Sequence, residues 1–334
     1  MKGDDTMLTT PMDILAQFPI RRSNAQKQAF RDAVQSYAES LGYTCTVESG
    51  SYGVRNLVIG DPRTAKYLVT AHYDTCARMP VPNLLMPDNP LLYILYQLGF
   101  NLLAILTAIV FGVVGAFATA LVYIACNEYP DAMIVVGLFM AACVVFFILA
   151  AVVLQFLLVW GSANRNNAND NTSGVVALLE ILRTLPENQR HKVCFVLFDL
   201  NEAGLLGSRV YKKEHRETIS TQLVLDLSCV GDGDHLLMIP TRELKQDVKK
   251  YKSVFKCCGY FGNKSLLVMD KGTSLIPSDH KRFPYGVCFM ACRKGKMGHY
   301  ISRIHTSKDT ILDQTNVNIL RAALTTLICG TAAQ

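Results

Sequence analysis

The stretch VCFVLFDLNEAGLLGS, residues 193–208, decides the fold. Its first part, 193–199, is an almost continuous apolar run, which is typical of a strand buried on both faces of a sheet. Polar residues follow at once, and then a short helix is expected at 204–213. Further strands are expected at 43–48, 54–59, 66–71, 222–227, 236–239, 265–269 and 286–291, and further helices at 24–41, 172–184 and 314–328. This alternation predicts an α/β fold: a three-layer sandwich with a mostly parallel central sheet flanked by helices.

A long uncharged insertion interrupts this pattern. No charged residue lies between Asn89 and Asn127, or between Ala132 and Asn164. Each stretch exceeds the roughly 20 residues that cross a bilayer as a helix. The sequence therefore predicts a two-helix transmembrane hairpin with spans at about 98–126 and 132–160 and a short polar turn, NEYPD, between them.

The hairpin divides the chain into three predicted parts. Residues 1–75 and 165–334 form the two parts of the α/β domain, and 76–164 hold a proline-rich interfacial segment followed by the hairpin. Arg78 and Arg165 flank the hairpin, whereas its turn has no basic residue, so both termini and the α/β domain are expected in the cytoplasm. The lipid bilayer is then a partner, and the two spans could also pair between subunits as a homo-oligomer.

Charge and cysteine content exclude other classes. The net charge of +6 is spread along the chain without a dense basic run, so we expect no nucleic acid partner. Eleven cysteines without a C-x-x-C pair indicate reduced thiols rather than a disulfide scaffold.

Five side chains of metal-binding types lie at predicted strand ends and loop starts: His72, Asp170, Glu202, Asp226 and His305. In open α/β sheets, ligands bind outside the carboxyl ends of the strands. Histidine mixed with carboxylate suits a zinc ion that performs hydrolysis. Five such groups exceed one catalytic site and could hold two ions about 3.5–4 Å apart through a shared carboxylate.

Each signal has a simpler explanation when taken alone. The HYD triplet, in which Asp74 could orient His72, is common by chance. Asp226 could be an ordinary strand-end acid, and HTSKDT at 305–310 could cap the last helix. Asp279 and His280 could line a substrate pocket or belong to a loop hydrogen-bond network. The interpretation as a metal site depends on all five candidate ligands occurring together in one chain.

Six motifs in order carry a family resemblance: H-Y-D at 72–74, N-D-N-T-S-G at 169–174, F-D-L-N-E-A-G-L-L-G-S at 198–208, L-D-L around Asp226, S-D-H-K-R-F at 278–283 and H-T-S-K-D-T at 305–310. Over roughly residues 20–75 and 161–334 the chain resembles the co-catalytic zinc aminopeptidase superfamily, which includes bacterial leucine aminopeptidases, glutamate carboxypeptidases and glutaminyl cyclases. The apolar hairpin is not part of the common family pattern.

The resemblance implies a role for each matching position. Of two zinc ions, one would be held by His72 and Asp226 and the other by Glu202 and His305, with Asp170 bridging them. Asp74 would support His72, and the S-D-H motif would place Asp279 and His280 near the substrate pocket.

One position departs from the family pattern. The residue before the glutamate ligand is normally a glutamate that acts as general base, and here it is Asn201. A neutral amide cannot accept a proton from water at pH 7, and this help is typically worth 10²–10⁴-fold in rate. Asp199, on the same strand face, is an alternative base.

The sequence thus predicts a membrane-anchored zinc exopeptidase, an aminopeptidase that uses a two-metal mechanism on peptide substrates near the membrane. Because of Asn201, two alternatives stay open. One is an impaired, zinc-binding pseudopeptidase that binds peptides or acts as a membrane scaffold. The other is acyl transfer of the glutaminyl cyclase kind.

Overall fold

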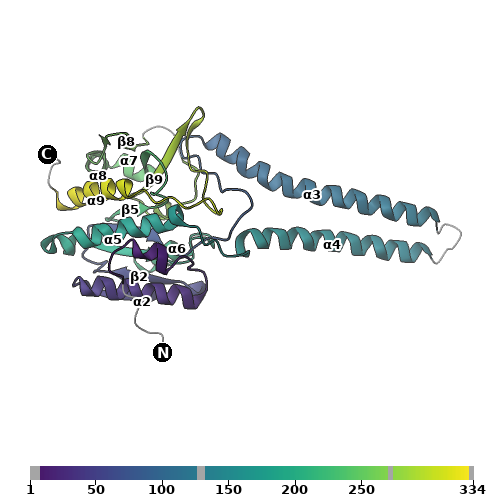
Figure 1. The fold of residues 1–334 in the computed structure, drawn as a ribbon, viewed down its shortest axis with the longest axis horizontal. Helices are drawn as coiled ribbons and strands as arrows, with labels where there is room; N and C mark the ends of the chain where they lie inside the picture. Colours follow the sequence, from purple (N-terminus) through teal and green to yellow (C-terminus); the bar gives the residue numbers. More distant parts are fainter. Residues whose placement is uncertain (1–7, 126–131, 270–273, 331–334) are drawn as a thin grey trace. The chain divides into compact units, whose positions relative to one another are not determined.

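The computed structural model describes residues 8–125, 132–269 and 274–330. The predicted NEYPD turn at 127–131 lies outside these residues. The chain forms two compact units, one made of Met1–Pro90 with Ala163–Gln334 and the other of Leu91–Ser162 (Figure 1). Residues 76–90, which we assigned to the insertion, therefore belong to the larger unit.

A ten-stranded sheet forms the centre of the larger unit, in the order β1-β2-β4-β3-β5-β9-β6-β8-β7, with β10 paired to β9. The strands are β1 (Cys45–Ser49), β2 (Arg55–Ile59), β3 (Tyr67–His72), β4 (Val193–Phe198), β5 (Leu223–Leu227), β6 (His235–Pro240), β7 (Gly259–Phe261), β8 (Lys264–Val268), β9 (Gly286–Gly295) and β10 (Gly298–Tyr300). The predicted strands are all present within one or two residues at their starts, whereas β7 and β10 were not predicted.

The prediction of a mostly parallel sheet was wrong. Among the described residues, four strand pairs are parallel: β3 with β4, β3 with β5, β5 with β9, and β6 with β8. The remaining pairs are antiparallel, because hairpins and reversed strands extend both edges of the sheet. The parallel block β4-β3-β5-β9 is nonetheless central, so the carboxyl ends of β3, β4 and β5 meet at one edge.

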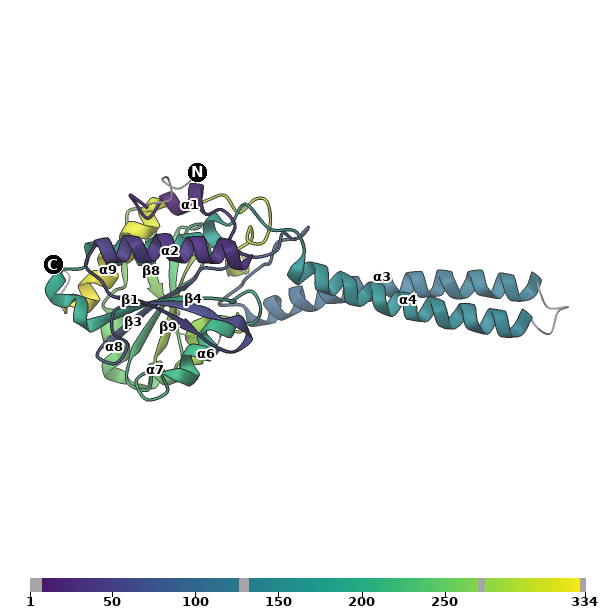
Figure 2. The same ribbon diagram turned by 90° about the horizontal axis from the view of Figure 1, so that it is seen from below.

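Helices cover both faces of this sheet, which confirms the α/β class. The helices of the larger unit are α1 (Asp13–Gln17), α2 (Asn24–Ser40), α5 (Gly174–Thr184), α6 (Leu206–Glu214), α7 (Arg242–Gln246), α8 (Val248–Phe255) and α9 (Gln314–Cys329). Alternate side chains of β4 point to opposite faces: Phe195 packs in the core that contains α2, α5 and α9, and Val196 packs in the core that contains Tyr211 of α6. Figure 2 shows α2 and α6 on opposite sides of the strands.

A buried ion pair anchors α2 beside the end of β4. Lys27 Nζ lies 2.8 Å from Asp199 Oδ1, and both side chains are almost fully buried. Asp199 also accepts hydrogen bonds from the backbone N–H groups of Arg55 and Leu200. These contacts occupy the carboxylate and keep it out of the candidate site, so Asp199 does not serve as the alternative base.

Replacing Lys27 with methionine should therefore destabilise the fold. The variant would leave a buried carboxylate without its cation, which typically costs about 3–5 kcal/mol of unfolding free energy. Chemical denaturation monitored by circular dichroism measures this loss. Lys212→Met, on the exposed side of α6, is the matched control and should change stability by less than about 0.5 kcal/mol.

The second unit consists of two long helices, α3 (Pro90–Ala125) and α4 (Ala132–Trp160), which run side by side in both views. Neither contains Asp, Glu, Lys or Arg. Among the described residues, however, no helix is both long and apolar enough to cross a membrane. The hairpin is thus present at the predicted positions, but the two predicted membrane spans are not found.

Candidate metal centre

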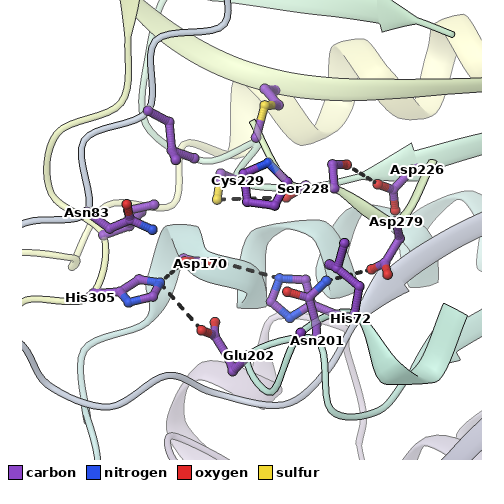
Figure 3. Close-up of a pocket in the computed structure, with 17 residues that line it drawn as sticks. His72, Asn83, Asp170, Asn201, Glu202, Asp226, Ser228, Cys229, Asp279 and His305 are labelled. Carbon is purple, nitrogen blue, oxygen red and sulfur yellow. Dashed lines mark hydrogen bonds and ion pairs between the residues drawn. The ribbon is translucent and has the colours of Figure 1, made fainter. Parts of the chain in front are cut away.

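A cavity of about 260 Å³ lies at the carboxyl ends of β3, β4 and β5. Its wall contains all five predicted ligands, together with Asn201 and Asp279 (Figure 3). His72 ends β3, Asp226 lies in β5, and Glu202 follows β4 by four residues. Long-range folding thus brings together the groups that the sequence pattern placed at one edge of the sheet.

Asp170 lies between the two histidines. Its Oδ1 is 3.4 Å from His72 Nε2, and its Oδ2 is 3.2 Å from His305 Nε2. The same His305 nitrogen is 3.6 Å from Glu202 Oε2. One carboxylate therefore presents one oxygen to each imidazole, which is the arrangement that a shared metal ligand requires.

Asp309 fixes the position of Asp170, and sequence reasoning missed it. The two Asp309 oxygens accept the backbone N–H groups of Asn169 at 2.8 Å and Asp170 at 3.0 Å. Asp309 belongs to the same HTSKDT segment as His305, so one loop supplies a candidate ligand and also positions another. In the sequence, this role of Asp309 is indicated only by its position four residues after His305.

Asp74 positions the loop that carries Asn201 and Glu202. Its Oδ1 accepts the Asn201 N–H and its Oδ2 accepts the Glu202 N–H, both at 3.0 Å. Asp74 Oδ1 also lies 3.4 Å from His72 Nδ1, but this contact lacks hydrogen-bond geometry. Asp74 therefore lies beside His72, and its two hydrogen bonds tie the end of β3 to the loop that follows β4.

Asn201 occupies the expected position of the base and is bonded to Asp279. Its Nδ2 donates to Asp279 Oδ2 at 2.7 Å, while Asp279 Oδ1 has no hydrogen-bond partner among the described residues. Asp279 is 2% exposed and lines the cavity, whereas His280 is buried outside its wall and bonds Ser278 at 2.8 Å. Of the two residues predicted to lie near a substrate pocket, Asp279 lines this cavity and His280 does not.

Two hydroxyl groups hold the Asp226 carboxylate in place. Thr70 and Ser278 hydroxyls each donate to one of its oxygens at 2.9 Å. Ligand atoms of Asp226, His280 and Cys288 lie within 4.8 Å of one another. His72, Asp170 and Glu202 form a separate group by the same distance. Asp226 thus lines the cavity and faces the region of His72 without an ion pair to it.

Burial and mutual contacts shift the pKa values of this cluster. Burial raises the pKa of Glu202 to about 7. Burial alone would lower the pKa of His305, but the charges of Glu202 and Asp170 outweigh it and raise that pKa to about 9. Burial would raise the pKa of Asp170, but contacts with both imidazoles lower it.

The donor set fits a divalent metal. Two imidazoles and two carboxylates converge in a buried space, and their negative charge draws protons onto the histidines. A divalent cation would replace these protons, because metal binding and protonation compete for the same nitrogen atoms. His72 Nδ1 is buried and lacks a hydrogen-bond partner among the residues that the structure covers. A mixture of histidine and carboxylate ligands suits zinc in a hydrolytic role.

Comparison with known proteins identifies the family. The pattern of peptidase family M28 matches residues 159–328, about half of the chain. The chain belongs to peptidase family M28, which confirms the superfamily resemblance and makes it a hydrolase or a related zinc-dependent enzyme. Asp170, Glu202, Asp226 and His305 all lie within the matched region.

Solved structures show the same fold. A glutaminyl cyclase from Bacteroides thetaiotaomicron bound to N-acetylhistamine has a TM-score of 0.56 at 16% identity, covering 95% of this chain and 94% of the other. A leucine aminopeptidase precursor from the same species has a TM-score of 0.54 at 16% identity, covering 95% and 93%. A Zn-dependent exopeptidase from Parabacteroides distasonis has a TM-score of 0.53 at 16% identity, covering 96% and 95%. At this identity the likeness establishes the fold alone.

Proposed function

We propose that this protein is a zinc-dependent exopeptidase, specifically an aminopeptidase that holds two zinc ions. The observation that carries the proposal is the position of Asp170, with one oxygen toward His72 and one toward His305. His72 and Asp226 would hold one ion, Glu202 and His305 the other, and Asp170 both. When bound, zinc supplies Lewis acidity that polarises the scissile carbonyl and lowers the pKa of water.

One residue of the chain must still act as general base and accept a proton from water. We assign this role to Asp279. The Asn201 amide has no basic site at pH 7, but it holds Asp279 Oδ2 at 2.7 Å. The other oxygen, Oδ1, lacks a hydrogen-bond partner within the described structure and belongs to a residue of the cavity wall. Burial, followed by the charge of Asp226, raises the pKa of Asp279 to about 7, which is suited to a general base near neutral pH.

An alternative function is supported by Asn201 itself. A chain that binds zinc and peptide termini without efficient turnover would act as a pseudopeptidase, in peptide binding or scaffolding. Acyl transfer of the glutaminyl cyclase type needs the same proton acceptor, so it depends on Asp279 to the same extent.

Turnover of substrate panels separates these functions. The full-length protein, supplied with zinc, is given aminoacyl amides and, separately, a peptide with N-terminal glutamine. Aminopeptidase activity should appear, disappear with a chelator and return with zinc. If the glutamine peptide is cyclised and the aminoacyl amides are not hydrolysed, the function is acyl transfer of the glutaminyl cyclase type rather than aminopeptidase activity. Bound zinc without either reaction would favour the pseudopeptidase.

We further propose that the α3–α4 hairpin attaches the protein to the cytoplasmic surface of a bilayer, so that substrates are membrane-proximal peptides. The support is the apolar surface of this unit: Val113 is 63% exposed and Ile124 is 70% exposed, on helices without charged residues. Flotation of the full-length protein with zwitterionic liposomes tests attachment. Binding that persists in high salt is expected, and protein that stays at the bottom of the gradient contradicts the proposal.

A further inference from the structure

A thiol lies beside the candidate metal centre, on a buried residue that does not line the cavity. The Cys76 Sγ, a carboxylate oxygen of Glu202 and a ring nitrogen of His305 all lie within 4.8 Å of one another. Cys76 is 1% exposed and, of the described residues, it is not among those that line the cavity. Its sulfur therefore approaches the Glu202–His305 pair from within the protein.

The distances suit a common metal ion. Zinc lies about 2.3 Å from a thiolate sulfur and about 2.0–2.2 Å from nitrogen or oxygen ligands, so tetrahedral donors are about 3.5 Å apart. Glu202 and His305 already have atoms 3.6 Å apart, and Asp170 is 3.2 Å from the same His305 nitrogen. The sulfur lies within 4.8 Å of both ligand atoms, so a side-chain rotation can bring it to the distance that a shared ion requires.

A second observation concerns the groups around the sulfur. Asn164 Nδ2 donates a hydrogen bond to Cys76 Sγ at 3.8 Å, and the Asn164 backbone N–H donates to the Cys76 carbonyl at 3.3 Å. Ala77 and Ala163 form a β-bridge next to this pair. The same Nδ2 donates to the backbone carbonyls of Asn166 at 2.6 Å and Thr306 at 3.0 Å, and these two contacts hold the amide beside the sulfur. An amide group fixed in this way positions the thiol next to the Glu202–His305 pair.

We propose that Cys76 is a ligand of the metal ion held by Glu202 and His305. This inference rests on the proposed zinc function and adds a residue to it. With Asp170 shared, that ion would have four protein ligands and a closed coordination shell, as in structural zinc sites. The ion held by His72 and Asp226 would keep the open position, facing the cavity. The two positions are therefore unequal: the thiolate position binds soft ions such as zinc or cobalt tightly and excludes magnesium.

Cobalt substitution tests this inference by spectroscopy. The full-length protein is freed of metal by a chelator and titrated with Co²⁺ while its metal content is measured. The first equivalent should produce a thiolate-to-cobalt charge-transfer band in the near ultraviolet. Cys76→Ser should lose the band and weaken the tightest cobalt site by at least about tenfold. Cys229→Ser, which changes a thiol in the cavity wall, and Cys45→Ser, far from it, should both keep the band.

X-ray absorption spectroscopy at the zinc edge gives a second measurement. It uses the unsubstituted, zinc-loaded protein, so it does not depend on the folding of a variant. A sulfur neighbour at about 2.3 Å from zinc is expected. Bound cobalt without a charge-transfer band, or a band that Cys229→Ser removes and Cys76→Ser keeps, would overturn the inference and leave the proposed function intact. A protein that binds neither zinc nor cobalt would overturn both.

Discussion

Asn201→Glu is expected to raise kcat for aminoacyl hydrolysis, but by less than the 10²–10⁴-fold that a general base usually contributes, because Asp279 already accepts the proton in the unsubstituted protein. The new carboxylate would lie where the Asn201 amide now is, directly beside Asp279. Two carboxyl groups within hydrogen-bond distance share one proton, so the pKa of one of them rises. Asp279 would hold that proton, and the glutamate, nearer the loop surface, would accept the one from water.

The matched control is Asn201→Gln, which has the length of glutamate without its charge. It should not gain activity, so that any increase in Asn201→Glu can be attributed to the carboxylate. Asp279→Asn in the unsubstituted background should reduce kcat by about 10²-fold or more, because it removes the proton acceptor. If Asp279→Asn keeps full kcat, Asp279 is not the base. If Asn201→Glu brings no gain, Asn201 is not what limits the rate.

His305→Ala should abolish turnover and reduce bound zinc from two ions to one per chain. His305 contacts both Asp170 and Glu202, so its loss removes one ligand and leaves two buried carboxylates without their nearest cationic partner. Because Asp170 is shared, the loss of this ion also disturbs the ion held by His72 and Asp226, which supplies the Lewis-acid stabilisation. Such stabilisation is worth several kcal/mol, and a loss of about 4 kcal/mol corresponds to about 10³-fold in kcat/KM.

His215→Ala is the control for this substitution. His215 pairs with Glu48 at 2.9 Å, away from the cavity, so the variant should keep two zinc ions and full turnover. Metal content is measured by elemental analysis of dialysed protein, and turnover with a single aminoacyl amide. Unchanged activity in His305→Ala would exclude this histidine from the metal centre, and unchanged zinc content would exclude it as a ligand.

The central strands were predictable from the sequence because burial on both faces leaves a local pattern. The run at 193–199 reads as a buried strand without knowledge of its neighbours, and the structure has β4 at Val193–Phe198. The same holds for β3 and β5, whose carboxyl ends carry His72 and Asp226. No local sequence pattern indicates whether a strand runs parallel or antiparallel to its neighbour. β6 runs antiparallel to β9 although both were predicted as strands, and this is why the sheet is mixed.

The sequence by itself determined the α/β class, the family and the position of each candidate ligand along the chain, because apolar periodicity and short motifs are local properties. The tertiary structure alone decided which groups meet. Asp309 bonds a backbone 139 residues away in sequence, and Asn201 bonds Asp279 across 78 residues. Cys76 reaches Glu202 and His305 in the same way. Such contacts depend on how the loops at the carboxyl ends of β3, β4 and β5 fold against one another, and no short-range pattern encodes that geometry.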